Sequence, residues 1–473
     1  MTLLKATLAT TFVAGMVNAA TLEERVEELE INNALNTFKF SGDLTMFYDG
    51  TEKEANSVTT TNNWTRLKFG INFNAKPSSD IQFFGRLAAS KHLNAIGNDY
   101  TSNDDFGSSR SYGGSDVFVE KAYFDYTMTD WMIFSAGRLP TFDGVPYNYS
   151  YGKAKMGTYP KLAYSAILDG FAFTFKPGNF FLDQGSLDFR VIYTPFNLPT
   201  QRQGASNQKF GNGQVAASHV DMLTLMLDYQ SGKLSWADNL GFIAQWIKAN
   251  QFGLSKIYAG EGIDVDANQN GADNGNAQAP VSNGIAVYLP STLKMGLDLL
   301  TLHLELDNIL ESGVNFSVTN YSNTITETGG ICFDASNPCT AANNSLGYFT
   351  NSTYANTNEM KAEGSATLAA LAWNSNMPML MNAIIGAEYM TSDKDYGFFD
   401  FTADNVTGFY TNAGKGTHAY ITLLPKNNLS FTLGYRLQEI EYSNTGTKGF
   451  GARKEVTTDD TVSTTYARLR LDF

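Results

Sequence analysis

The sequence predicts an all-β protein, a transmembrane antiparallel up-and-down β-barrel of about 16 strands (about 14–18) with a short N-terminal helix. Three observations predict this fold. The chain begins with a secretion signal, apolar and polar residues then alternate with a period of two, and the connections between these stretches are by turns short and long. A barrel with short periplasmic turns and long extracellular loops has this organisation.

Residues 1–19 have the layout of a secretory signal peptide. One cation, Lys5, precedes an uncharged stretch that ends in a Val17-Asn18-Ala19 cleavage site. The stretch is rich in Thr and Ala and falls short of the roughly 20 apolar residues that a membrane-spanning helix needs. We therefore expect an exported, cleaved chain in the bacterial outer membrane of a Gram-negative cell.

The composition agrees with a barrel whose inner face is polar. The chain has 33 Phe, 24 Tyr and 42 Gly but only 12 Pro, and a mean hydropathy of −0.22. Lumen-facing polar residues that alternate with lipid-facing apolar ones produce such an average. The formal net charge of −14 argues against a nucleic-acid partner, because phosphate binding needs a basic surface.

Residues 20–35 are expected to form a short amphipathic helix or periplasmic leader. Leu22, Val26 and Leu29 recur at helical spacing, and Thr21 with Glu24 forms a capping box. The segment could plug or dock against the barrel, form a short coiled coil, or remain a frayed acidic leader. The barrel itself is expected over 37–473.

The period changes to two from Thr37 onward. Leu67, Phe69 and Ile71 alternate with polar neighbours, as do Leu429, Phe431 and Leu433, which is typical of strands with two chemically different faces. The strands expected on this basis are 38–48, 64–75, 80–91, 116–127, 131–139, 169–176, 186–194, 219–229, 239–248, 291–299, 301–312, 362–374, 379–390, 417–424, 428–442 and 463–473.

The connections alternate in length along the chain. Short turns are expected at 76–79, 129–130, Leu300 alone and 425–427. Long loops are expected at 49–63, 92–115, 140–168, 249–290, 313–361, 391–416 and 443–462. The alternation stays in phase if the first strand starts from the periplasm and the last strand returns to it.

Charged residues on the polar face of these strands are expected to line the lumen, because a charge on the lipid face costs about 2–4 kcal/mol at the middle of the bilayer. They either select solutes in an open pore or form salt bridges that fill a narrow barrel. About sixteen strands favour the pore. The expected lining residues are Arg66, Lys68, Arg86, Lys121, Arg138, Arg190, Glu305, Asp307, Arg436, Arg468 and Arg470.

The loop at 140–168 is the expected constriction. General porins, which this architecture resembles, fold their third loop into the barrel. An ordinary surface loop is the alternative. The loop carries a carboxylate, tyrosines and lysines that would set a size and charge preference, namely Asp143, Tyr147, Tyr149, Tyr151, Lys153 and Lys155.

Two other loops carry motifs. Cys332 and Cys339 enclose a six-residue loop, and a disulfide is expected in an exported chain. The acidic run at 264–271 resembles a calcium loop in spacing but lacks the glycine and glutamate that such a loop needs, so a flexible loop is favoured. We predict neither a cofactor nor a metal site.

No catalytic motif is present. The four histidines are scattered, and the sequence holds no nucleophile elbow, zinc-binding motif or phosphate loop. An active site assembled on the barrel from distant residues is the alternative, as in outer-membrane phospholipases and proteases. We expect no enzymatic activity.

The last strand ends in Phe473 on its apolar face. A terminal Phe on an alternating strand resembles the assembly signal of bacterial outer-membrane proteins, which implies barrel-assembly machinery and membrane lipid as partners.

A second resemblance covers most of the chain. The leader TLEERVEELE at 21–30, EKAYFDYTMTDWMIFSAGRLPTFDGVPYNYS at 120–150 and GTYPKLAYSAILDGFAFTFKP at 157–177 resemble an uncharacterised porin-like outer-membrane family, domain of unknown function 3373. The resemblance implies a barrel in the outer membrane and leaves the solute open.

The predicted function is a porin-like channel for passive diffusion of small hydrophilic solutes. The alternative is an adhesin or surface-layer protein that displays long acidic loops on a barrel anchor. By analogy with sixteen-stranded porins a homotrimer is one option for the assembly. A plugged importer is disfavoured, because the stretch between the cleavage site and the first strand is too short for a plug.

Overall fold

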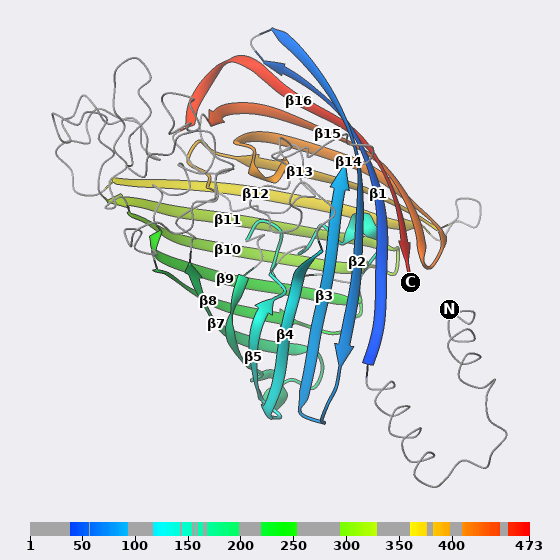
Figure 1. Ribbon diagram of the computed structural model, residues 1–473, viewed down its shortest axis with the longest axis vertical. Helices are drawn as coiled ribbons and strands as arrows, with labels where there is room; N and C mark the ends of the chain where they lie inside the picture. The colour runs from blue at the N-terminus through cyan, green and yellow to red at the C-terminus, as the bar shows by residue number, and fades with distance from the viewer. Residues whose placement is uncertain are drawn as a thin grey trace, which may run out of the picture.

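The computed structural model describes residues 38–55, 57–92, 117–141, 144–153, 157, 159–163, 168–197, 219–252, 294–328, 360–375, 382–397, 409–444 and 453–473. These residues form one closed antiparallel barrel in which each strand pairs with its neighbours in sequence, and β1 pairs with β16 to close it (Figure 1). None of the helices in this part of the chain is long and apolar enough to cross a membrane.

The sixteen strands of the barrel are, in order, β1 (Phe38–Ala55), β2 (Val58–Ala75), β3 (Ile81–His92), β4 (Phe118–Thr129), β5 (Met132–Leu139), β6 (Leu168–Phe175), β7 (Ser186–Asn197), β8 (His219–Gln230), β9 (Asn239–Phe252), β10 (Lys294–Ile309), β11 (Val314–Thr328), β12 (Met360–Ser375), β13 (Ala383–Ser392), β14 (Gly414–Lys426), β15 (Leu429–Asn444) and β16 (Arg453–Asp472). Among the described residues, three short helices accompany them, η2 (Tyr149–Tyr151), α3 (Gly178–Phe181) and η6 (Phe409–Thr411). The predicted fold class and strand number are therefore confirmed.

The two faces of the wall differ in chemistry, as the alternation predicts. On β16, Leu469 is 44% exposed while its neighbour Arg468 is buried. On β15, Leu433 is exposed and Thr432 is buried. Because side chains of a strand point alternately to opposite faces, the apolar side chains cover the outside of the barrel and the polar ones point into its interior.

The sequence-based strand boundaries are wrong around residue 300. The expected turn at Leu300 is absent, because β10 runs through it and pairs continuously with β9. Leu297 and Leu299 are buried, whereas Leu300 and Leu302 are exposed. The leucines therefore change face between positions 299 and 300, and this change of phase in the sequence imitates a turn.

The true turn lies after β10, and the predicted loop at 313–361 begins with a strand. Leu310 and Glu311 have φ values of +52° and +56° in this turn. β11 follows from Val314 and pairs along its length with β10 and β12. Its outer positions are apolar at the start of the strand, up to Val318, but polar at Asn320 and Ser322. The alternation therefore ends halfway along the strand.

The expected long loop at 49–63 is also strand. β1 and β2 continue to Ala55 and Val58, which pair with each other at the tip of a hairpin. This part of the hairpin is rich in Thr, Asn and Glu, and without apolar residues the period of two is invisible. β16 likewise begins at Arg453, ten residues before the expected 463.

The barrel closes where its ends meet. Gly42 of β1 and the terminal Phe473 exchange two backbone hydrogen bonds, of 2.7 and 2.9 Å. The Phe473 ring stacks on Phe69 of β2 with centroids 6.1 Å apart. The final residue is therefore part of the seam, and Figure 1 shows the C-terminus beside β1.

Candidate functional site

The connection between β5 and β6 enters the interior of the barrel. Its described residues are mostly buried, and η2 within it packs against β13, β14 and β15 on the far side of the wall. Gly152 ends η2 with a φ of +60°. A Cβ on Gly152 would lie 2.6 Å from Cδ1 of Ile384, so both the turn and the close approach favour glycine. We refer to the described residues 144–153, 157 and 159–163 as the inserted segment.

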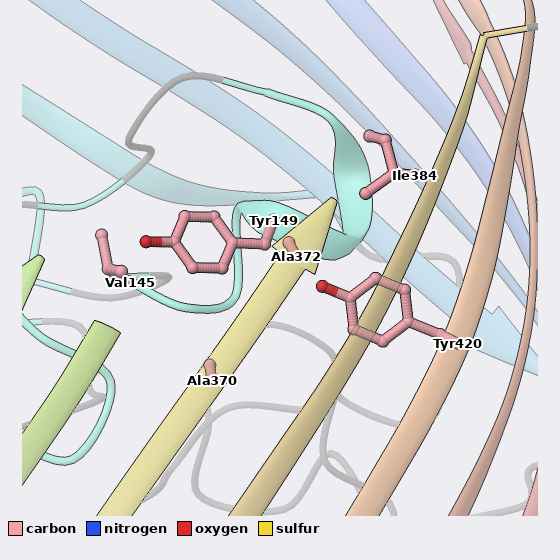
Figure 2. Packing of buried hydrophobic residues seen from close by; sticks show 6 residues of the cluster. All are labelled: Val145, Tyr149, Ala370, Ala372, Ile384 and Tyr420. Atoms are coloured by element: carbon pink, nitrogen blue, oxygen red, sulfur yellow. The ribbon is translucent and has the colours of Figure 1, made fainter. Parts of the chain in front are cut away.

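Apolar contacts fasten the inserted segment to β12, β13 and β14. Val145 and Tyr149 pack in one buried cluster with four wall residues, as Figure 2 shows. Two of the wall residues are alanines, and their small side chains leave space for the Tyr149 ring. The wall residues of this cluster are Ala370, Ala372, Ile384 and Tyr420.

Arg468 of β16 holds the backbone of the inserted segment. One guanidinium nitrogen donates to the Ser150 carbonyl oxygen at 2.5 Å and to the Thr432 hydroxyl at 3.1 Å. The guanidinium carbon lies 3.4 Å from the centroid of the Tyr151 ring. The Thr422 hydroxyl donates to the same Ser150 carbonyl at 2.7 Å. A buried carbonyl with two donors, one of them charged, is a strong attachment point.

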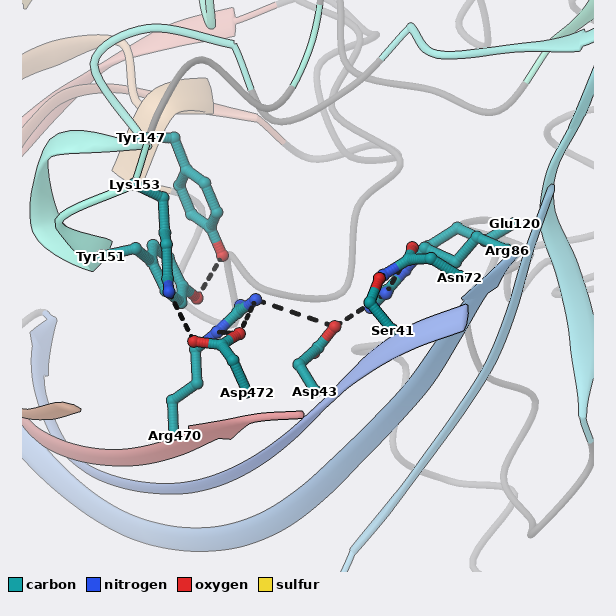
Figure 3. Close-up of polar contacts among 10 residues, drawn as sticks. All are labelled: Ser41, Asp43, Asn72, Arg86, Glu120, Tyr147, Tyr151, Lys153, Arg470 and Asp472. Carbon is teal, nitrogen blue, oxygen red and sulfur yellow. Dashed lines mark hydrogen bonds and ion pairs between the residues drawn. The ribbon is translucent and has the colours of Figure 1, made fainter. Parts of the chain in front are cut away.

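An ion pair anchors the segment beside the C-terminus. Lys153 Nζ lies 2.6 Å from Asp472 Oδ2, and the hydroxyls of Tyr147 and Tyr151 are 2.8 Å apart. Arg470 contacts Asp472 at 2.8 Å and Asp43 at 3.7 Å. Figure 3 shows this row of contacts leading from the inserted segment across the seam of the barrel.

The row continues through Arg86 of β3. Arg86 pairs with Asp43 at 2.7 Å and with Glu120 of β4, and it donates to the Asn72 side chain at 3.0 Å. All three charged groups are buried. Arg86 therefore compensates part of the charge of the two carboxylates, and Arg470 supplies a second cation to Asp43.

A second buried network, which sequence reasoning missed, lies on β13 to β16. His418 Nε2 is 2.8 Å from the Tyr466 hydroxyl, and its Nδ1 lies 3.2 Å from Glu388 Oε2. The Tyr410 hydroxyl donates to Glu388 at 2.8 Å. Lys161 of the inserted segment places its ammonium 5.2 Å from the Tyr410 ring centroid. The one sequence signal was a carboxylate at Glu388 within a largely apolar strand.

The structure places most of the predicted lining charges on the inner side of the wall, and these side chains are either buried or half-buried. Arg66, Arg86, Glu305, Arg436, Arg468 and Arg470 are buried. Lys68, Lys121, Arg190 and Asp307 are half-buried.

Arg138 is the exception among these charges. Its guanidinium makes two hydrogen bonds, of 2.7 and 3.0 Å, to Asp169, whose side chain is 64% exposed. The strand register puts Arg138 on the same face of the sheet as Phe134 and Phe171, which is the outer face. The partner carboxylate explains how a charge stays on that face.

The three predicted constriction tyrosines, Tyr147, Tyr149 and Tyr151, are buried within the inserted segment. Burial, with the nearby charges of Glu305 and Asp307, raises the pKa of the Tyr149 phenol far above its usual range. Burial raises the pKa of Tyr159 as well. Both phenols are therefore neutral at physiological pH.

Several predictions fall outside the described residues. They are the signal peptide 1–19, the leader helix 20–35, Asp143 and Lys155 of the constriction loop, the calcium-like run 264–271, and Cys332 with Cys339. Within the described part of the chain, no group of three His, Cys, Asp or Glu residues is arranged to hold a metal ion.

Several solved structures are similar to this chain. OmpF of Salmonella typhi in complex with daunomycin is 12% identical, with a TM-score of 0.45 and coverage of 92% of this chain and 97% of that chain. The anion-selective porin from Comamonas acidovorans is 8% identical, with a TM-score of 0.48 and coverage of 92% and 99%. OmpT of Vibrio cholerae, in a trimer form, is 12% identical, with a TM-score of 0.44 and coverage of 92% and 99%.

A comparison with curated proteins finds no match. A family model described as a protein of unknown function, DUF3373, matches residues 53–469, which is nearly the whole barrel. The chain belongs to this family, DUF3373.

Proposed function

We propose that the chain is an outer-membrane channel for the passive diffusion of small hydrophilic solutes. The apolar outer face and polar interior of the closed barrel support a place in a lipid bilayer. Sixteen strands also form a wide barrel, since barrels of about 16–18 strands leave an aqueous channel and those of about eight are filled by side chains.

The inserted segment is the observation that carries the proposal. A barrel used only as an anchor has no need of a connection that crosses its interior, whereas a channel needs a constriction to select solutes. Lys153 and Ser150, which follow β5 in the chain, contact Asp472 and Arg468 of the last strand, β16. In this proposal the segment narrows the lumen, and residues 140–168 set the size limit.

Planar-bilayer recording of the purified, folded protein tests this function. We expect stepwise openings, and a larger unitary conductance after deletion of residues 144–153, because the deletion removes the constriction. Asp80→Asn, at an exposed turn, is the matched control and should conduct like the parent. A folded, membrane-inserted barrel without conductance above background would overturn the proposal.

A further inference from the structure

A cavity lies against the wall opposite the contacts of the inserted segment. It has a volume of about 240 Å³ and is bounded by the inner faces of β4, β5, β6 and β7, with Tyr159 of the inserted segment at one side. The lining residues used below are Tyr123, Asp125, Tyr159, Lys176, Asp188 and Arg190.

Two of the charges in this cavity already have partners. Arg190 lies 3.0 Å from Asp188 and 2.9 Å from Asp228, so one cation is shared between two carboxylates. All three side chains are less than one-fifth exposed. One cation and two carboxylates leave this triad with a net negative charge when both carboxylates are ionised. This charge acts on the other two charged groups of the cavity, which have no such close partner.

Asp125 is one of the remaining groups. It accepts a hydrogen bond from the Ser135 hydroxyl at 2.6 Å, and it forms no ion pair with any residue that the structure describes. The Asp125 side chain is half-buried. A carboxylate held away from bulk water with one neutral donor keeps acceptor capacity for a cationic ligand.

Lys176 is the second remaining charged group of the cavity. Its backbone amide donates to the Trp131 carbonyl at 2.8 Å, which fixes the start of its stem at the end of β6. Among the described residues its ammonium has no ion-pair partner, and the side chain is half-buried. Asp125 and Lys176 thus supply opposite charges to one cavity without forming an ion pair with each other, and Tyr123 and Tyr159 line the same cavity.

We propose that this cavity is a binding subsite for small zwitterions that carry one ammonium and one carboxylate group. The ligand ammonium pairs with Asp125, its carboxylate pairs with Lys176, and its alkyl part lies against Tyr123 or Tyr159. Charge-assisted hydrogen bonds in a half-buried pocket favour such a solute over water or a neutral molecule. The subsite rests on the proposed function, because solutes reach it through the lumen.

Calorimetric titration of the detergent-folded protein tests the subsite without requiring conductance. The probes are glycine, β-alanine, 4-aminobutyrate and 6-aminohexanoate, which separate the two charges by increasing lengths. Propionate, propylamine and propionamide carry one charge or none. We expect at least one zwitterion to bind more tightly than every control probe, with a maximum at one chain length.

Two variants locate the effect. Asp125→Asn and Lys176→Gln should each weaken the preferred probe about tenfold or more, as expected for the loss of a charge-assisted contact. Asp80→Asn and Lys233→Gln remove the same kinds of charge at exposed turn positions and should leave binding unchanged. If either site variant fails to fold, the comparison of probes on the parent protein still decides the proposal.

The outcomes separate the subsite from the channel. Equal binding of zwitterions and singly charged probes, or no binding of any probe, overturns the subsite whether or not the protein conducts. Binding of zwitterions without conductance supports the subsite as a binding site and overturns the channel. If the protein conducts but calorimetry shows that it binds all probes equally, the channel stands and the subsite is overturned.

Discussion

Lys153 Nζ lies 2.6 Å from Asp472 Oδ2, one residue before the terminal Phe473. The two side chains are 31% and 24% exposed, so water screens the pair only in part. The pair joins the inserted segment to the strand that closes the barrel. Its position makes barrel closure and segment placement mutually dependent.

Exchanging the charges of this pair should reveal its coupling. Lys153→Asp and Asp472→Lys alone each create a like-charge contact. We expect each to destabilise the barrel and to increase the fluctuations of the single-channel current in planar bilayers. The double variant restores the attraction between positions 153 and 472, while the new lysine still faces Arg470 in both proteins that carry it. Urea unfolding of all four proteins should give a coupling free energy of about 0.5–1 kcal/mol, as for partly exposed pairs. Additive effects of the two single variants would show that the pair does not hold the segment.

Arg468→Met should loosen the inserted segment more than any single surface change. It removes the donor to Ser150 and Thr432 and the contact with Tyr151. We expect a loss of about 1.5–3 kcal/mol in the free energy of unfolding, because a hydrogen bond to a charged group is lost in a buried site. Arg468→Lys should recover only part of this, since an ammonium cannot reproduce the planar fork. Unfolding in urea measures both, and full recovery by lysine would contradict the assigned geometry.

Gly386→Ala should displace the ring that supports Tyr149. A Cβ at this position would lie 2.2 Å from Cζ of Tyr420, and Tyr420 belongs to the cluster under the inserted segment. We expect a destabilisation of about 1–3 kcal/mol, as for overpacked cores. Ala387→Val adds volume on the outer face of the same strand and serves as the control. Equal stability of the Gly386→Ala protein and the control would refute this packing.

Glu311→Gly should stabilise the turn between β10 and β11. Glu311 has a φ of +56°, which costs an L-residue about 1 kcal/mol and glycine little. Its contact with Lys233 is 3.8 Å long and highly exposed, so little is lost. We expect a gain of about 0.5–1 kcal/mol in thermal or urea unfolding. Gly313→Ala, at a φ of +79°, should destabilise the protein instead. Destabilisation by Glu311→Gly or stabilisation by Gly313→Ala would contradict this turn geometry.

Alkaline titration of the tyrosine phenols should report whether the inserted segment is packed inside the barrel. Burial raises the pKa of Tyr149 and Tyr159, whereas the unfolded phenols titrate near pH 10. The folded state therefore keeps protons that the unfolded state loses, and stability present below about pH 10 falls as the pH rises further. Phenolate absorbance should appear at a higher pH in the parent than in the protein lacking residues 144–153, after allowance for the tyrosines removed. Identical titration of the remaining tyrosines in both proteins would contradict a packed segment.

The sequence predicts the barrel well where apolar residues are regular and fails where they are not. The alternation around Leu433 or Leu469 marks strands because a bilayer-facing surface must be apolar on one side only. At Leu299 and Leu300 the leucines change face, and the expected turn there is wrong. The strand count nevertheless agrees, because the division of β10 in two compensates for the missed β11.

The sequence by itself determined the chemistry of the two faces, since a period of two assigns each side chain to one face of a strand. Only the tertiary structure decided which charges meet. Ser150 and Arg468 are 318 positions apart in the chain, and closure between β1 and β16 is needed before Asp43 can contact Arg470. No local pattern encodes such contacts, because they arise when the wall closes and the inserted segment packs across the interior.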